Sequence, residues 1–217
     1  MEKRDLFIFD MDGTMFDTEP ISYICWQEIC HRHGYDLQYD VFERFLGMNV
    51  ASIKQICMET FGTDFPYDQI ETEKMAYQVE YYHTHDIPIK KGLIECLDYA
   101  KEQGIPCAVA SSSRLDLVTY LVEKNKVAPY FSLLQSGAHI AHGKPAPDIF
   151  LMVCDKMGVK PAKALVFEDS MNGVLAAHNA QIPVIWIPDL VRIPANVAAY
   201  AWHECQSLAD VPSLLSK

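Results

Sequence analysis

The sequence of 217 residues has no long apolar run and no excess of positive charge. No stretch approaches the roughly 18 apolar residues of a transmembrane helix, and the apolar segment from Leu6 to Phe9 is too short for the core of an export signal. Lys and Arg number 18 against 29 Asp and Glu, a formal net charge of −11. This sign opposes broad attraction to nucleic acid or to an anionic membrane, so we expect neither as a partner.

The seven cysteines contain no C-x-x-C pair, and their odd number and irregular spacing do not suggest a disulfide framework. A reducing, cytoplasmic setting fits them best. Internal repeats, low-complexity tracts and a strong Gly, Pro or Ser bias are absent, while 50% hydrophobic and 22% charged residues are ordinary globular values. The length predicts one large domain, or one domain with a smaller insert, and we expect a monomer.

Short apolar runs separated by helical stretches predict a parallel α/β sheet. These runs span residues 6–9, 105–110, 164–167 and 182–187. They are continuous and do not alternate with polar residues, which is typical of strands buried on both faces. Ligands of such sheets bind beyond the carboxyl ends of the strands, where Asp10, Ser111 and Asp169 would emerge.

The strand-like runs disappear between residues 19 and 86, where apolar residues fall at helical spacing. Pro20 and Pro88 stand near the two connections of this segment. The sequence therefore predicts an all-helical domain over 19–86, inserted into a core formed by 1–18 and 87–217. The insert could act as a lid.

Acidic residues follow two of the predicted strands. Asp10 and Asp12 come after the first strand, and Glu168 and Asp169 come after the run that ends at 167. Like charges held together are costly unless a cation or hydrogen bonds compensate, and Mg²⁺ prefers oxygen ligands. Asp10 with Glu168 and Asp169 would make a suitable magnesium site. Alternatively, Asp10 and Asp12 only end a strand before a turn, as Asp often does.

Two further stretches carry groups that bind phosphate. Ser111-Ser112-Ser113-Arg114 places hydroxyls, backbone amides and a cation at a predicted helix start, and Lys144 stands in a proline-fixed turn, Gly143-Lys144-Pro145-Ala146-Pro147-Asp148. Each alone could be a helix cap or a solvated loop. As an ordered set along one α/β chain, they are hard to attribute to chance.

The four stretches D-M-D-G-T, S-S-S-R, G-K-P-A-P-D and E-D-S-M-N-G resemble the ordered motifs of the haloacid dehalogenase superfamily. The helical insert is similar to the cap type of β-phosphoglucomutase-like sugar phosphatases, and the resemblance covers essentially the whole chain. It implies a Rossmann-like core with a mobile helical cap. It also implies an enzyme, a phosphoric monoester hydrolase that uses Mg²⁺ and an aspartyl-phosphate intermediate.

The resemblance implies a role for each acidic residue of the motifs. Asp10 would be the nucleophile and a magnesium ligand. Asp12 would be the general acid and base, with its backbone carbonyl also meeting the metal. Asp169 would complete the metal site, with Glu168 alongside it or reaching it through water.

The resemblance also implies the residues that bind the substrate. Ser111 and Lys144 would hold the transferring phosphoryl group, with Ser112 beside them among the phosphate-binding residues. Arg114 follows these serines and would either contact the substrate or be a surface charge at a helix start.

Two cap positions bear on the choice between hydrolysis and a mutase reaction. A β-phosphoglucomutase has a histidine in its first cap helix and a phosphate-binding arginine in a cap loop, where this chain has Ser22 and Val50. Because a mutase must hold a second phosphate, we expect a phosphatase of small phosphorylated metabolites, sugar phosphates above all, with a hexose-phosphate mutase as the alternative. Asn49 and Lys54 are cap residues that could contact the substrate, and Lys54 or Lys74 could replace the missing arginine.

A non-enzymatic phosphoacceptor module of the receiver type is an alternative of another class. It also uses an aspartate, acids near the first strand and a lysine in an α/β sheet. In a receiver module the acceptor aspartate follows a later strand, and no helical insert follows the first strand. The order of these features in this chain therefore disfavours a receiver module.

Overall fold

The structure is a computed structural model that describes residues 4–48, 50–138 and 140–216. The described residues form six β-strands and ten α-helices. The chain folds as two units, Met1–Phe16 with Ile89–Lys217 (the sheet unit) and Asp17–Pro88 (the helical unit). These limits lie two residues from the boundaries expected from the sequence. Of the helices described, none is both long enough and apolar enough to cross a membrane.

The sheet unit is built on a parallel sheet of strand order β3-β2-β1-β4-β5-β6. The strands are β1 Leu6–Phe9, β2 Cys107–Ser111, β3 Phe131–Ser136, β4 Ala164–Glu168, β5 Val184–Trp186 and β6 His203–Glu204. The predicted α/β class with a parallel sheet is therefore confirmed. β2 begins two residues into the apolar run at 105–110 and ends one residue after it, and β5 covers only the middle of the run at 182–187. β3 and β6 were not predicted.

Proline explains why two of these strands begin late. Pro106 and Pro183 have no N–H to donate, so the regular ladders start after them. Their carbonyls still accept hydrogen bonds, from Phe7 at 3.0 Å and from Val166 at 2.9 Å. β3 and β6 lie at the two edges of the sheet, where residues stay partly exposed and the apolar signal is weaker.

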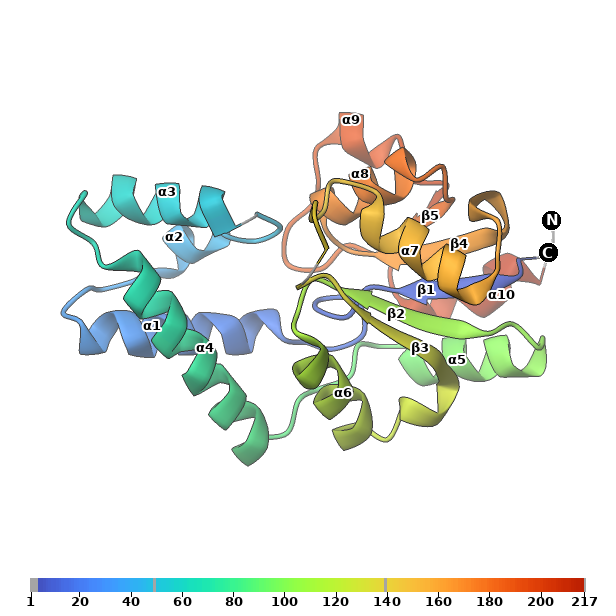
Figure 1. The fold of residues 1–217 in the computed structure, drawn as a ribbon, viewed down its shortest axis with the longest axis horizontal. Helices are drawn as coiled ribbons and strands as arrows, with labels where there is room; N and C mark the ends of the chain where they lie inside the picture. The colour runs from blue at the N-terminus through green and yellow to red at the C-terminus, as the bar shows by residue number, and fades with distance from the viewer. Residues whose placement is uncertain (1–3, 49, 139, 217) are drawn as a thin grey trace. The chain divides into compact units, whose positions relative to one another are not determined.

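Both faces of β1 are buried, which accounts for its unbroken apolar run. Leu6 and Ile8 pack into one core with α7 and α8, whereas the ring of Phe167 stacks on Phe9 at 4.6 Å and meets Phe7 edge-on at 5.2 Å. Figure 1 shows α7 and α8 on one side of the sheet and α5 and α6 on the other. The helices of this unit are α5 Leu93–Glu102, α6 Leu115–Lys124, α7 Asp148–Met157, α8 Met171–Asn179, α9 Ala195–Ala198 and α10 Val211–Leu215.

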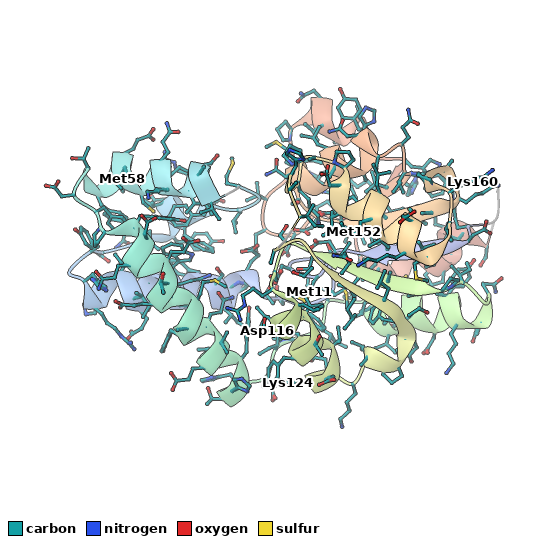
Figure 2. All side chains as sticks on the ribbon, viewed as in Figure 1. Met11, Met58, Asp116, Lys124, Met152 and Lys160 are labelled. Carbon is teal, nitrogen blue, oxygen red and sulfur yellow. The ribbon has the colours of Figure 1, made fainter. Side chains whose placement is uncertain are left out.

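The helical unit has its own core, rich in aromatic rings. Trp26 packs against Phe45 and Tyr67, with ring centroids 5.5 and 5.9 Å apart. Met58, labelled in Figure 2, packs against this core from α3. The helices of this unit are α1 Glu19–Arg32, α2 Tyr39–Glu43, α3 Val50–Phe61 and α4 Tyr67–Thr84.

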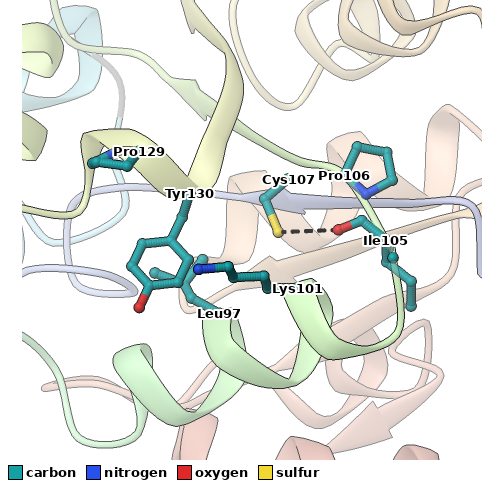
Figure 3. Close-up of a pocket in the computed structure, with 8 residues that line it drawn as sticks. Leu97, Lys101, Ile105, Pro106, Cys107, Pro129 and Tyr130 are labelled. Carbon is teal, nitrogen blue, oxygen red and sulfur yellow. Dashed lines mark hydrogen bonds between the residues drawn. The ribbon is translucent and has the colours of Figure 1, made fainter.

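A cavity of about 320 Å³ lies beside α5 (Figure 3). It is lined by Leu97, Lys101, Gly104, Ile105, Pro106, Cys107, Pro129 and Tyr130. Cys107 is the first residue of β2, so the cavity lies at the amino ends of the strands. Parallel sheets bind their ligands at the opposite ends, so a reaction site is expected at the other edge, beyond Phe9.

All seven cysteines are buried and none forms a disulfide. Burial raises the pKa of the Cys30, Cys57 and Cys107 thiols to about 12. Because the thiolate is the reactive form, we expect almost no reaction of the native protein with Ellman's reagent at pH 8, and reaction of all seven thiols after denaturation in guanidinium. Rapid labelling of several thiols in the native protein would contradict this burial.

Candidate active site

A tight turn follows the central strand β1. The N–H of Asp10 donates to the carbonyl of Phe167 at 3.0 Å and continues the pairing of β1 with β4. Gly13 has a φ of +79°, in the left-handed region that favours glycine, and its N–H donates to the carbonyl of Phe16 at 3.0 Å. The turn therefore keeps Asp10 and Asp12 at the carboxyl end of the sheet.

Lys144 reaches this end from the loop between β3 and α7. Its Nζ donates to Oδ1 of Asp10 at 2.5 Å and to Oε1 of Glu168 at 2.6 Å, and it lies 5.0 Å from the centre of the Phe150 ring. The Lys144 side chain is only 7% exposed. Burial disfavours the ammonium group, but the attraction of Asp10 and Glu168 outweighs this cost and raises the Lys144 pKa above its usual value. The two carboxylates therefore favour the charged form of the lysine.

Glu168 and Asp169 are held by further hydrogen bonds. Oε2 of Glu168 accepts from the backbone N–H of Ser170 at 2.8 Å and from its hydroxyl at 3.0 Å. Thr14 donates its hydroxyl to Oδ1 of Asp169 at 2.8 Å, while Trp186 Nε1 donates to the Asp169 carbonyl at 2.9 Å. Both acidic residues at the end of β4 are therefore fixed in orientation.

Asp10, Glu168 and Asp169 can together hold a metal ion. Each offers a carboxylate oxygen, and the three oxygens lie within 4.8 Å of one another. Burial raises the Asp10 pKa well above its usual value; Lys144 opposes this, and the charges of Glu168 and Asp12 add to it. Negative charge is therefore in excess around Asp10, and a hard divalent cation with oxygen ligands fits this donor set.

The side chain of Asp12 points to a different set of partners. Its Oδ2 accepts from the hydroxyl of Ser113 at 2.9 Å and from that of Ser111 at 3.4 Å. The N–H of Ser113 donates to Ser111 Oγ at 3.0 Å, which joins the two serines. Ser112, which the sequence placed among the phosphate-binding residues, is exposed. The contact of Ser113 with Asp12 was not predicted.

The structure brings most of the expected site residues together at one end of the sheet. Asp10, Asp12, Ser111, Lys144, Glu168 and Asp169 form this group. Arg114 instead forms a two-pronged ion pair with Asp116, labelled in Figure 2, at 3.1 and 2.8 Å. In the helical unit, Lys54 donates to both oxygens of Asp68 at 2.7 Å. Asn49 lies outside the described residues.

Several residues that hold the site had no predicted role. Thr14, Ser113 and Ser170 lie inside or beside the four motifs, so their position in the sequence was a signal for them. Lys90 and Asp189 also form an ion pair near this turn, at 2.5 Å. They are 99 residues apart, and nothing in the local sequence pairs them.

The chain belongs to the haloacid dehalogenase-like hydrolases, whose sequence profile matches residues 7–187. This confirms the resemblance seen in the four motifs. The parallel sheet and the acidic cluster at its carboxyl end are consistent with this membership.

Known relatives extend the match over most of the chain. A probable pseudouridine-5'-phosphatase of Drosophila melanogaster is 29% identical over 211 residues, 94% of this chain and 89% of the relative. A phosphorylated carbohydrates phosphatase of Thermotoga maritima is 30% identical over 82% of each chain. A putative β-phosphoglucomutase structure from Thermotoga maritima superposes with a TM-score of 0.79 at 24% identity, over 98% of each chain. This structural likeness shows a shared Rossmann-like fold.

The raised pKa of Asp10 predicts a pH-dependent stability. Because the native state binds the Asp10 proton more tightly than the unfolded chain, whose pKa is near 3.8, stability contributed by this group falls as pH rises through the native pKa. We expect Asp10→Asn to raise the unfolding temperature of the metal-free protein at pH 8, and by less at pH 5.

Asp116→Asn is the matched control. The hydrogen bond from Arg114 lowers the Asp116 pKa, so this substitution should lower the unfolding temperature at pH 8 and not raise it. Thermal unfolding followed by circular dichroism measures both variants. An Asp10→Asn protein that is less stable than the wild type at pH 8 would contradict the excess of negative charge around Asp10.

Proposed function

We propose that this protein is a Mg²⁺-dependent phosphatase that hydrolyses small phosphorylated metabolites, sugar phosphates above all, through an aspartyl-phosphate on Asp10. The assignment as a phosphoric monoester hydrolase follows from the family and from its phosphatase relatives. The observation that carries the mechanism is the group around Asp10, a buried carboxylate with Lys144 on one side and two further acids within metal-binding distance.

In the first step, Asp10 attacks the phosphorus. A carboxylate needs to lose no proton to do so, and the bond from phosphorus to the sugar oxygen breaks as the acyl-phosphate bond forms. Lys144 offsets the negative charge of the phosphoryl group and fixes the Asp10 carboxylate by the 2.5 Å hydrogen bond. A magnesium ion bound by Asp10, Asp169 and Glu168 would add further positive charge at the phosphoryl oxygens.

Asp12 moves the proton in both steps. It donates a proton to the departing sugar oxygen, then accepts one from the water that attacks the acyl-phosphate. The hydroxyls of Ser113 and Ser111 orient its Oδ2 for this purpose.

The phosphatase relatives act, by their names, on a phosphorylated nucleoside and on phosphorylated carbohydrates, which supports a small phosphorylated substrate. We assign the helical unit, Asp17–Pro88, the role of a cap that determines substrate choice by recognising the part of the substrate other than the reacting phosphate. Seven reduced cysteines support a cytoplasmic location, and the enzyme is expected to act as a monomer.

Asp10→Asn tests the nucleophile, because an amide of the same shape cannot attack phosphorus. We expect kcat on hexose phosphates to fall by about a thousand-fold or more, measured as released phosphate across a panel of sugar phosphates, polyol phosphates and nucleotides. Chelation with EDTA should remove wild-type activity, and added Mg²⁺ should restore it.

Asp155→Asn, the same change at an exposed position of α7, should leave kcat within about two-fold of the wild type. Substantial turnover by Asp10→Asn, or full wild-type activity in excess chelator, would refute the mechanism.

The reaction products test hydrolysis against a mutase reaction. Ser22 and Val50 stand where a mutase would have a histidine and an arginine, so the acyl-phosphate should be open to water. Given β-glucose 1-phosphate with a trace of the 1,6-bisphosphate, the protein should release phosphate in large excess over glucose 6-phosphate. Glucose 6-phosphate as the main product would reject the phosphatase assignment.

A further inference from the structure

Asp189 is a buried carboxylate that the proposed reaction does not use. Its side chain is 9% exposed, and its Oδ1 accepts a hydrogen bond from Nζ of Lys90 at 2.5 Å. Its second oxygen, Oδ2, is buried and has no hydrogen-bond partner among the residues that the structure describes. Buried carboxylate oxygens normally accept at least one hydrogen bond, so this oxygen lies where it can serve another donor.

The unpartnered oxygen lies close to Asp169, one of the three acids of the proposed metal site. Oδ2 of Asp189 lies 3.1 Å from the point where a side chain on Gly13 would begin, and Oδ2 of Asp169 lies 2.5 Å from the same point. The two carboxylates therefore approach each other at Gly13, and only a residue without a side chain fits between them.

Lys90 ties this carboxylate to the turn after β1. Its side chain pairs with Asp189, while its backbone N–H donates to the carbonyl of Met15 at 2.8 Å. The neighbouring Ile89 forms an antiparallel bridge with Phe16. One residue thus fixes both the acid and the turn that carries Asp10 and Asp12.

We propose that Asp189 is an outer carboxylate of the metal site, with Lys90 as its positioning counter-ion. In this assignment Oδ2 of Asp189 accepts a hydrogen bond from a water molecule bound to the cation held by Asp10, Glu168 and Asp169. Magnesium keeps several of its waters in proteins, and each of those waters needs an acceptor. The inference rests on the proposed magnesium site and adds a residue that no motif contains.

Calorimetric titration of Mg²⁺ into the chelator-treated protein, without substrate, tests the proposal. We expect Asp189→Asn to weaken Mg²⁺ binding by about ten-fold, the usual effect of losing an outer partner of a metal site. The rise in unfolding temperature on adding Mg²⁺ should shrink in parallel, since this rise follows the affinity. Glu204→Gln is the matched control, because Glu204 forms an exposed ion pair with Arg192 in the same unit, and it should bind Mg²⁺ like the wild type.

A second variant separates hydrogen bonding from simple charge. Lys90→Met combined with Asp189→Leu keeps the net charge and replaces the pair by apolar side chains of similar size. If this variant loses as much Mg²⁺ affinity as Asp189→Asn, the result supports the role of Asp189 as a hydrogen-bond acceptor. If either the double variant or Asp189→Asn binds Mg²⁺ as tightly as the wild type, the proposal is overturned. If the double variant does not fold, Asp189→Asn alone decides.

Asp169→Asn distinguishes this failure from failure of the proposed function. Loss of Mg²⁺ binding in Asp169→Asn with no change in Asp189→Asn would reject only the outer carboxylate. Unchanged binding in Asp169→Asn, or no binding by the wild type, would reject the metal site itself.

Discussion

The ammonium group of Lys144, buried between Asp10 and Glu168, is the interaction on which the site depends. Without it, two carboxylates would lie buried side by side with no counter-charge, an arrangement that costs several kcal/mol. With it, the cluster is still unbalanced, because Asp12 and Asp169 add two more acids. The site therefore gains from a bound divalent cation, and an acidic protein can bind an anionic phosphate only where such positive charge is concentrated.

The fold supplies the rigidity that this charge arrangement needs. Asp10, Ser111 and Glu168 stand at the ends of three neighbouring parallel strands, whose pairing fixes their backbone positions. Beneath them, both faces of the sheet are filled by apolar side chains, each of which contributes about 1.5–3 kcal/mol when fully buried. Burial of this apolar surface offsets the cost of holding like charges together at the edge.

The sequence predicted the parts of the molecule that have a short-range signal. The unbroken apolar runs indicated the central strands, and the four motifs indicated the acids and Lys144 as candidate site residues. Prolines at 106 and 183 shortened two strands, and the edge strands β3 and β6 escaped notice because partial exposure weakens the apolar pattern. The hydrogen bond from Ser113 to Asp12 was also out of reach, because it depends on how the turn after β2 closes, which residue type does not determine.

The pair of Lys90 and Asp189 shows the other limit of sequence reasoning. It joins positions 99 residues apart through the packing of the sheet, so no spacing rule could indicate it. Its physical role also differs from that of Lys144, since it pairs one positive with one negative charge and leaves the local net charge unchanged. At this end of the sheet, the excess of negative charge comes from the acids around Asp10. A cation attracted to this end of the sheet is drawn to those acids, while Asp189, neutralised by Lys90, can orient a water molecule without competing for the ion.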